Sequence, residues 1–339
     1  MARLIRNTRQ RAVSRAPARH LVVCQHDGRF DSTVEVAEIS DLIQQKDQIV
    51  WVDLQNPRAE DLALLSDEFG FHPLAIEDAT HPHERPKIDA YNGYYFLLFY
   101  ALRYDAAQKR ISSQQVSLFI GANYLVCIHQ DPIAAIDETI RRWQRYEHDF
   151  GEDVAELLYH LLDTIVDEYF PILDALIERV EDVEAQIFDH FRPESLQEIF
   201  ALKRELLLMR KIVASERDVL NVLIRREAPV YPRDMVAYFQ DVYDHLIRMT
   251  DSIDTYRDLL SSALDAFLSL QSNQLNEVVK TLTIASIILM SAALIAGVYG
   301  MNFEFMPELS WPWGYPFALG LMAAISLLLI AIFKRRGWL

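Results

Sequence analysis

The chain has 339 residues, of which 51% are hydrophobic, and its 49 acidic residues outnumber its 33 basic residues to give a formal net charge of −16. A field of this sign repels nucleic acid and concentrates cations, so we expect no nucleic-acid partner. The two cysteines, Cys24 and Cys127, lie far apart and outside any CxxC pattern. This spacing argues against a disulfide framework and indicates a reduced, cytoplasmic setting.

The first 19 residues differ in charge from the rest of the chain, because they hold six arginines and no acidic residue. No apolar run follows these arginines, so the segment is not a secretory signal. We expect residues 1–19 to form a basic disordered tail. Such a tail either contacts anionic lipid or has no role of its own.

Residues 20–150 are predicted to form a cytoplasmic α/β domain with a mixed sheet. Short runs rich in β-branched and aromatic residues are typical of strands. These runs cover residues 20–26, 33–39, 48–54, 94–103, 114–120 and 124–129. One helix is predicted over residues 58–70, where Gly70 closes it, and another from Asp131 to about Tyr146.

Residues 151–280 are predicted to form a helical region and a stalk helix, because apolar residues recur there at helical spacing. Breaks are expected near Arg192–Pro193 and at residues 228–232. After Pro232 nothing interrupts the pattern until Gly297. The sequence therefore predicts one helix that runs from the cytoplasm into the membrane.

An acidic stretch lies within this helical region. Residues 163–189 hold nine acidic side chains and a single basic one, Arg179. Such a run fits a solvated helix face. The alternative is that it attracts cations toward the mouth of a pore.

Two uncharged segments near the C-terminus, Thr281–Phe303 and Leu309–Phe333, exceed the roughly twenty residues that a bilayer-spanning helix needs. The predicted organisation is a transmembrane helix over residues 281–300, an external loop over 301–313, a second transmembrane helix over 314–333 and a basic cytoplasmic C-terminus over 334–339. Lysine and arginine flank the spans but are absent from the loop, so the positive-inside rule places both termini in the cytoplasm. We therefore expect a multi-pass protein of the cell inner (plasma) membrane.

The first span has two unlike faces. One row of small or polar residues, spaced by three and four, contains Asn276, Val279, Thr283, Ser286, Met290, Ala293 and Gly297. The opposite row holds Ile284, Ile288 and Ile295. A small row fits either close helix packing or the lining of a narrow pore. Two spans cannot enclose a pore, so the second interpretation requires an oligomer.

The residues after the first span carry a motif. Gly300-Met301-Asn302 is followed by Met-Pro-Glu-Leu at residues 306–309 and by an aromatic run at residues 311–316. Placed between two C-terminal spans, this pattern resembles the CorA family of magnesium transporters. The resemblance extends more loosely over about residues 20–339.

The resemblance implies an α+β membrane protein that assembles as a homopentameric funnel in the lipid bilayer, with the first spans around the pore. It assigns the selectivity filter to Gly300, Met301 and Asn302. It assigns the pore lining and gate to Asn276, Val279, Leu282, Met290, Ala293 and Gly297. The external residues Glu304 and Glu308 either gather cations or are ordinary loop charges.

The resemblance also implies regulation by cytoplasmic Mg²⁺ bound between subunits. The matching carboxylates are Asp78 in the α/β domain and Asp265 on the long helix, with Glu77 as an assistant. Mg²⁺ is thus both the transported ion and a regulatory ion, and no organic cofactor is expected.

We therefore predict a divalent cation channel for Mg²⁺ influx down the electrochemical gradient, which also passes Co²⁺ and Ni²⁺. One alternative is a Zn²⁺ transporter of the same superfamily. Another is a membrane-tethered signalling or scaffold protein. Enzymatic activity is not expected, because no GxxxxGK[ST] loop, GxSxG elbow or nucleophile–base pairing stands out. A zinc site around His72, His81 and His83 is less favoured than a polar turn.

Overall fold

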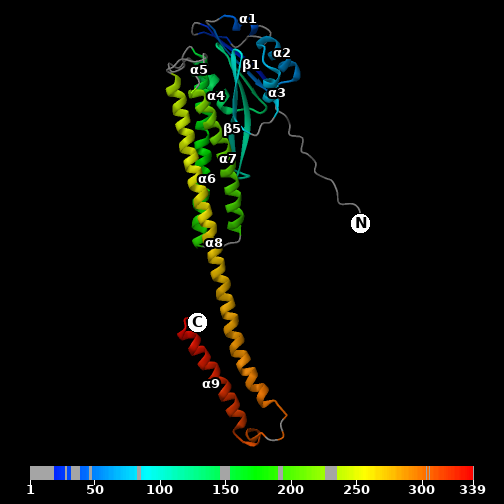
Figure 1. The fold of residues 1–339 in the computed structure, drawn as a ribbon, viewed down its shortest axis with the longest axis vertical. Helices are drawn as coiled ribbons and strands as arrows, with labels where there is room; N and C mark the ends of the chain where they lie inside the picture. The colour runs from blue at the N-terminus through cyan, green and yellow to red at the C-terminus, as the bar shows by residue number, and fades with distance from the viewer. Residues whose placement is uncertain are drawn as a thin grey trace, which may run out of the picture. The chain divides into compact units, whose positions relative to one another are not determined.

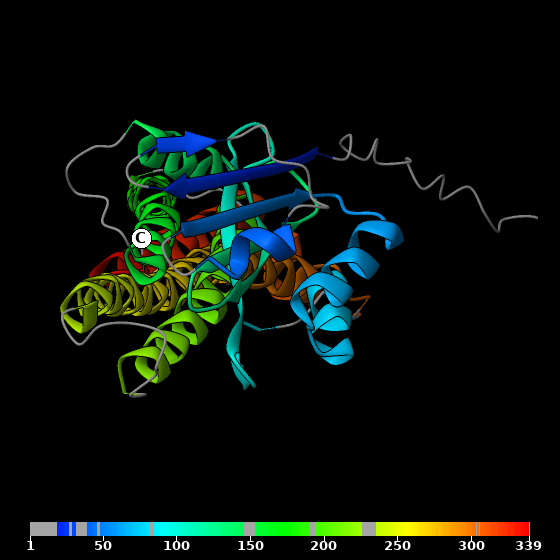
Figure 2. The ribbon, with the colours of Figure 1, turned by 90° about the horizontal axis from the view of Figure 1, so that it is seen from above.

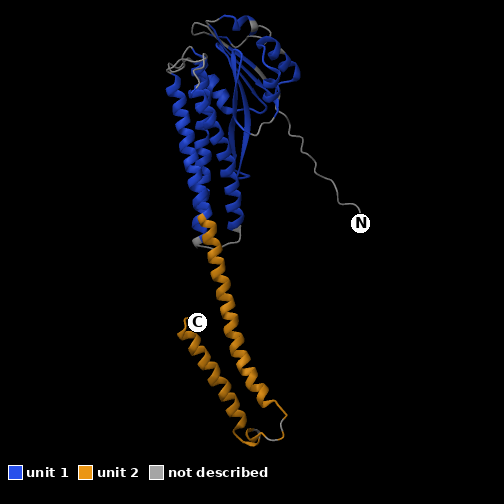
Figure 3. Ribbon diagram, in the orientation of Figure 1, with its two compact units in different colours: residues 1–261 blue, residues 262–339 orange. Residues whose placement is uncertain are grey.

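The computed structural model describes residues 19–338 with the exception of 27–28, 32–38, 46–47, 82–84, 146–152, 190–193, 226–234, 303 and 305. The chain divides into two compact units, a first unit of residues 1–261 and a second unit of residues 262–339 (Figure 3). The predicted basic tail lies outside the described residues, except for Arg19, which begins the first strand.

The first unit is built on one seven-stranded mixed sheet with the order β2-β1-β3-β7-β6-β5-β4. Its strands are β1 (Arg19–His26), β2 (Arg29–Asp31), β3 (Gln48–Gln55), β4 (Lys87–Tyr91), β5 (Tyr94–Asp105), β6 (Arg110–Ile120) and β7 (Tyr124–His129). The neighbours β3 and β7 run parallel, and the other neighbouring strands run antiparallel. The predicted mixed sheet is therefore confirmed.

Five of the six predicted strands match observed strands to within a few residues. The sixth, residues 33–39, lies outside the described residues except for Ile39, which begins the short helix α1 (Ile39–Ile43). The sequence did not indicate β2 and β4. These strands have 3 and 5 residues, which is too short for a clear alternation of apolar and polar positions.

Three further helices belong to the α/β region. The predicted helix over 58–70 is α2 (Ala59–Phe69), and Gly70 follows it with a φ of 66°, a left-handed conformation that glycine adopts without strain. Helix α4 (Ala134–Gln144) lies within the predicted range 131–146. Helix α3 (Pro73–Thr80) was not predicted.

Helix α3 is attached to the sheet at its N-terminal end. Phe71, just before α3, is 2% exposed and stacks on Phe119 of β6 with ring centroids 4.1 Å apart. The N–H of His72 donates a hydrogen bond to the Tyr94 hydroxyl at 2.9 Å. These contacts fix the position of the helix that carries Glu77 and Asp78.

Long helices complete the first unit: α5 (Val154–Asp167), α6 (Tyr169–Asp189), α7 (Glu194–Arg225) and the N-terminal part of α8 (Met235–Tyr299). Figures 1 and 2 show α5, α6 and α7 on one side of the sheet and α2 and α3 on the other. The interruption between α5 and α6 at Glu168 was not predicted. Pro171 explains it, because proline cannot donate to the carbonyl of Asp167 and its ring clashes there.

The second unit contains the rest of α8, the short 3₁₀ helix η2 (Pro307–Ser310) and α9 (Gly314–Arg335). Helix α8 is continuous over 65 residues, as the sequence predicted. Both α8 and α9 contain a segment long and apolar enough to cross a membrane. The two predicted spans therefore exist as helices.

Candidate pore segment and cytoplasmic metal site

The two faces of α8 differ in exposure within the second unit. The predicted pore row is exposed, with Leu282 at 66% and Met290 at 70%. The other predicted pore residues, Asn276, Val279, Ala293 and Gly297, are exposed as well. The opposite face is more covered, and Ile284 is only 6% exposed. The predicted row therefore lies on the side of α8 that is left open.

The predicted filter follows directly at the end of α8. The N–H of Gly300 donates to the carbonyl of Ala296 at 2.9 Å, and the N–H of Met301 donates to the carbonyl of Val298 at 3.3 Å. A Cβ atom on Gly300 would lie 3.1 Å from the Ala296 carbonyl oxygen, closer than most real contacts. The glycine thus permits a close approach at this helix end.

The motif ends at Asn302, whose side chain is exposed. Among the described residues, none forms a hydrogen bond with its amide. In the same loop, the side chains of Glu304 and Glu308 are also exposed.

The start of α9 contains a glycine whose role the sequence did not indicate. A Cβ atom on Gly314 would lie 2.1 Å from the carbonyl oxygen of Glu308, so only glycine fits here. This close approach holds η2 against the first turn of α9. It places the backbone of Glu308, one of the two predicted external acids, against the start of α9.

The first predicted regulatory carboxylate, Asp78, is half-buried and has a cationic partner. Its Oδ2 atom lies 2.5 Å from Lys87 Nζ, which also lies 2.9 Å from Asp89 Oδ2. Burial alone would lower the pKa of Lys87, but the hydrogen bonds to Asp78 and Asp89 outweigh burial and raise it. A metal ion at Asp78 would therefore compete with a bound ammonium group.

The other two predicted regulatory residues are exposed. Glu77 belongs to α3 in the first unit, whereas Asp265 lies on α8 in the second unit. Their sharing of an ion with Asp78 across a subunit boundary stays a prediction.

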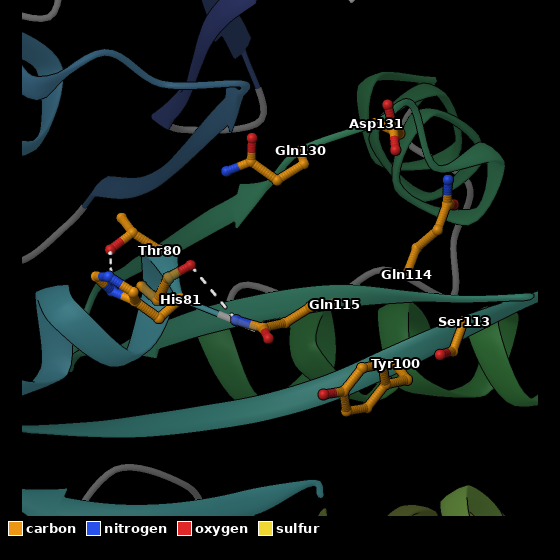
Figure 4. Close-up of a pocket in the computed structure, with 9 residues that line it drawn as sticks. Thr80, His81, Tyr100, Ser113, Gln114, Gln115, Gln130 and Asp131 are labelled. Atoms are coloured by element: carbon orange, nitrogen blue, oxygen red, sulfur yellow. Dashed lines mark hydrogen bonds between the residues drawn. The ribbon is translucent and has the colours of Figure 1, made fainter. Parts of the chain in front are cut away.

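A cavity of about 310 Å³ adjoins the C-terminal end of α3 (Figure 4). Gln115 of β6 lines this cavity. Its Nε2 atom donates a hydrogen bond to the carbonyl of Asp78 on α3 at 3.1 Å. His81 contacts the Glu77 carbonyl through Nδ1 at 3.0 Å. His81 directly follows α3. Residues 82–84 lie outside the described residues, so the choice between a polar turn and a zinc site there stays a prediction.

A second group of potential metal ligands lies between α5 and α8 within the first unit. Ligand atoms of Asp163, Asp167 and His245 all lie within 4.8 Å of one another. The two nitrogens of His245 lie 3.9 Å from carboxylate oxygens, Nδ1 from Asp167 and Nε2 from Asp241. Carboxylate and imidazole together suit divalent transition metals.

Burial and like charges act on the carboxylates of this group. Burial and, after it, the charge of Asp167 raise the pKa of Asp163 to about 6, while His245 opposes the shift. The Nδ1 atom of His245 is buried and has no hydrogen-bond partner among the described residues. A divalent ion would neutralise the crowded carboxylates and supply a partner for this nitrogen.

The sequence held a signal for this group. Asp163 and Asp167 are four residues apart, and so are Asp241 and His245, which puts each pair on one face of its helix. In the sequence the first two aspartates were recognised only as part of an acidic run. The approach of α5 to α8 that joins the pairs is a tertiary contact and has no local pattern.

The fold and these sites define a membrane protein with two C-terminal spans and a large α+β region. The profile of the family described as "CorA-like Mg2+ transporter protein" matches residues 46–335. The chain belongs to this family.

Two bacterial relatives share most of their length with the chain. The "Cobalt/magnesium transport protein CorA" of Thermotoga maritima is 37% identical over 292 residues, 85% of this chain and 83% of the relative. The "Putative metal ion transporter YfjQ" of Bacillus subtilis is 35% identical over 85% of this chain and 89% of its own length.

Solved structures agree with the sequence relatives. The complete structure of the CorA magnesium transporter from Methanocaldococcus jannaschii has a TM-score of 0.83 at 26% identity, over 94% of this chain and 98% of that one. A ZntB cytoplasmic domain from Vibrio parahaemolyticus, at 13% identity and a TM-score of 0.58 over 66% of this chain and 88% of that one, shares the fold alone.

Proposed function

We propose that the chain forms a divalent cation channel of the inner membrane that admits Mg²⁺, and also Co²⁺ and Ni²⁺. The supporting observation is the family match over residues 46–335, which includes the Gly300-Met301-Asn302 motif at the end of a continuous α8. The relatives from Thermotoga maritima and Methanocaldococcus jannaschii are both named as cobalt/magnesium transport proteins.

Selection would occur at a ring of Asn302 side chains from identical subunits, which we propose to number five. Mg²⁺ gives up its water reluctantly and prefers oxygen ligands. Neutral amide oxygens can accept hydrogen bonds from the hydrated ion without removing its water. The exposed amide of Asn302 suits this role, and Glu304 and Glu308 would gather cations outside it.

Below the ring, the exposed row on α8 would line the pore. This row exposes small or polar groups at Asn276, Ala293 and Gly297. Contact with lipid would not stabilise such groups. Leu282 and Met290 would form apolar constrictions, which can close by excluding water. With both termini in the cytoplasm, the membrane potential would drive ions inward.

Regulation would come from cytoplasmic metal. The group of Asp163, Asp167, Asp241 and His245 is a candidate site, in addition to Asp78, Glu77 and Asp265 between subunits. A metal ion shifts a conformational equilibrium only when it binds one state more tightly. Carboxylates that repel one another when empty meet this condition if the closed state brings them together.

The test is radiotracer or fluorescent-dye uptake of Mg²⁺ into proteoliposomes that contain the full chain. We expect Asn302→Ala to reduce uptake by at least tenfold, about 1.4 kcal/mol in the free energy of ion binding or passage. Asn221→Ala makes the same chemical change on α7, in the first unit, and should leave uptake intact.

Three outcomes would reject the proposal. Equal uptake by the wild type and Asn302→Ala would remove the filter. No uptake by the wild type would favour the signalling or scaffold alternative. Zn²⁺ uptake that depends on a proton gradient, without Mg²⁺ uptake, would instead favour the zinc transporter.

A further inference from the structure

The second unit contains a cavity at the edge of the proposed ion pathway, because Asn276 and Val279 belong to the predicted pore lining, whereas Lys280 and the residues at the end of α9 do not. Its volume is about 460 Å³, and it lies where the start of the apolar part of α8 meets the end of α9. Its lining comes from both helices and comprises Asn276, Val279, Lys280, Thr283, Arg336, Gly337 and Trp338.

The cavity is rich in positive charge. Both Lys280 and Arg336 line it. Lys280 Nζ donates to the Gly337 carbonyl at 3.1 Å and lies 3.4 Å from the exposed carboxylate of Glu277. Among the described residues, no carboxylate pairs with Arg336. The cations therefore exceed the local anions.

The wall formed by residues 336–338 is ordered by its own backbone. The N–H of Gly337 donates to the Lys334 carbonyl at 3.2 Å, and the N–H of Trp338 donates to the Phe333 carbonyl at 2.9 Å. With Gly337 at a φ of 68°, this is a Schellman motif. The Trp338 ring stacks on Phe333 with centroids 5.8 Å apart. Arg336 is thus carried by a defined helix end.

We propose that this cavity binds the phosphate-bearing headgroup of an anionic glycerophospholipid. Lysine supplies a point charge and arginine a planar pair of donors for phosphate oxygens. The uncharged segments begin at Thr281 and end at Phe333, so the cavity lies at the level of the membrane–water interface. Basic pockets between transmembrane helices at this depth bind lipid headgroups.

A free phosphate would offer the same oxygens, but the surroundings favour a lipid. Trp338 combines an apolar ring with an N–H donor, a combination enriched at membrane interfaces. Exposed apolar side chains of α9, including Leu328 and Ile332, continue from the cavity along the span. They offer a surface for acyl chains, which a free phosphate lacks.

The test is native mass spectrometry of the full chain released from micelles that contain phosphatidylglycerol or phosphatidylcholine. We expect the wild type to retain phosphatidylglycerol and to lose phosphatidylcholine. The double variant Lys280→Gln/Arg336→Gln should retain at least fivefold less phosphatidylglycerol. The control pair Lys334→Gln/Arg335→Gln loses the same charge outside the cavity lining and should change retention less than twofold.

A charge-keeping variant, Lys280→Arg/Arg336→Lys, separates binding from misfolding, and we expect it to retain the lipid. Equal loss of phosphatidylglycerol retention in Lys280→Gln/Arg336→Gln and in Lys334→Gln/Arg335→Gln would overturn the proposal. The lipid would then be attracted by the general positive charge of this helix end and not by the cavity. Equal retention of both lipids by the wild type would also overturn it. Displacement of the lipid by millimolar inorganic phosphate would overturn the assignment to a lipid.

Discussion

At the scale of single residues, the carboxyl group of Glu216 is unusual in its burial. It is fully buried on α7, where Oε1 accepts the N–H of Tyr100 at 3.1 Å and lies 3.1 Å from the Tyr169 hydroxyl. That hydroxyl also donates to the Tyr100 carbonyl. The Tyr169 hydroxyl has one proton, which it shares between the Tyr100 carbonyl and Glu216 Oε1. Burial outweighs these hydrogen bonds and raises the pKa of Glu216 well above its ordinary value of 4.5.

The raised pKa of Glu216 predicts a pH effect on stability. Above pH 4.5 the unfolded chain loses this proton while the folded chain keeps it, so the contribution of Glu216 to stability falls as pH rises. Glu216→Gln keeps a neutral hydrogen-bonding group and should reduce the fall in melting temperature between pH 5 and pH 8 by roughly 2–4 °C.

Thermal melts of the full chain in detergent would measure this effect. Glu178→Gln, a change at an exposed position on α6, serves as the control and should leave the pH dependence as it is. An equal loss of melting temperature at both pH values in Glu216→Gln would show that the carboxyl is not held neutral.

The metal-ligand group of α5 and α8 gives a second prediction at this scale. If cytoplasmic metal acts there, Asp163→Asn should raise the internal Mg²⁺ concentration that halves uptake by about tenfold, because loss of a ligand carboxylate weakens the site. Uptake assays with Mg²⁺ clamped inside the liposomes measure it. Asp251→Asn, an exposed aspartate of α8, is the matched control.

Comparison with Asp265→Ala would divide the regulatory role between the two candidate locations. An unchanged inhibitory concentration in Asp163→Asn would remove the α5–α8 group from regulation. The same result in Asp265→Ala would remove Asp265.

At the scale of elements, α8 links the helical region to the proposed pore. We expect Leu282→Asp to raise leak of Mg²⁺ severalfold at inhibitory internal Mg²⁺, because a ring of carboxylates would hydrate the apolar constriction. Leu282→Ile keeps the constriction apolar and should leave the leak at the wild-type level. Flux through Leu282→Asp that stays fully inhibited would place the gate elsewhere on α8.

The long elements were predictable from the sequence because the residue pattern typical of a helix or strand continues over many positions in each of them. Helix α8 has no proline or glycine between Pro232 and Gly297, and α9 carries no charged residue from Gly314 to Phe333. The strands β3, β5 and β7 are rich in β-branched or aromatic residues. Short elements such as β2, β4 and α3 contain too few residues for a periodic pattern of apolar positions to be recognised.

The sites were less predictable than the elements. The motif at residues 300–302 was recognisable because three adjacent residues carry it. The group of Asp163, Asp167 and His245 joins two helices that lie far apart in the sequence, and Gly314 is required only because Glu308 folds back onto it. Such contacts arise from tertiary packing, which a local pattern does not encode.

At the scale of the whole molecule, the proposed channel depends on assembly. The open side of α8 exposes Asn276 and Gly297 beside Leu282 and Met290, which is a poor surface to present to lipid alone. Identical subunits around a common axis would cover this side and bring their Asn302 amides together. The proposed channel therefore requires an oligomer, and the membrane potential would be its driving force.

The most direct test is Mg²⁺ uptake by the purified wild-type chain in liposomes with an imposed potential and no other protein. A dication gains about 4.6 kcal/mol per 100 mV on entering a negative interior. We predict that uptake rises steeply when the interior is made negative and falls when the potential is collapsed. Absence of uptake, or uptake that does not respond to the potential, would contradict the channel.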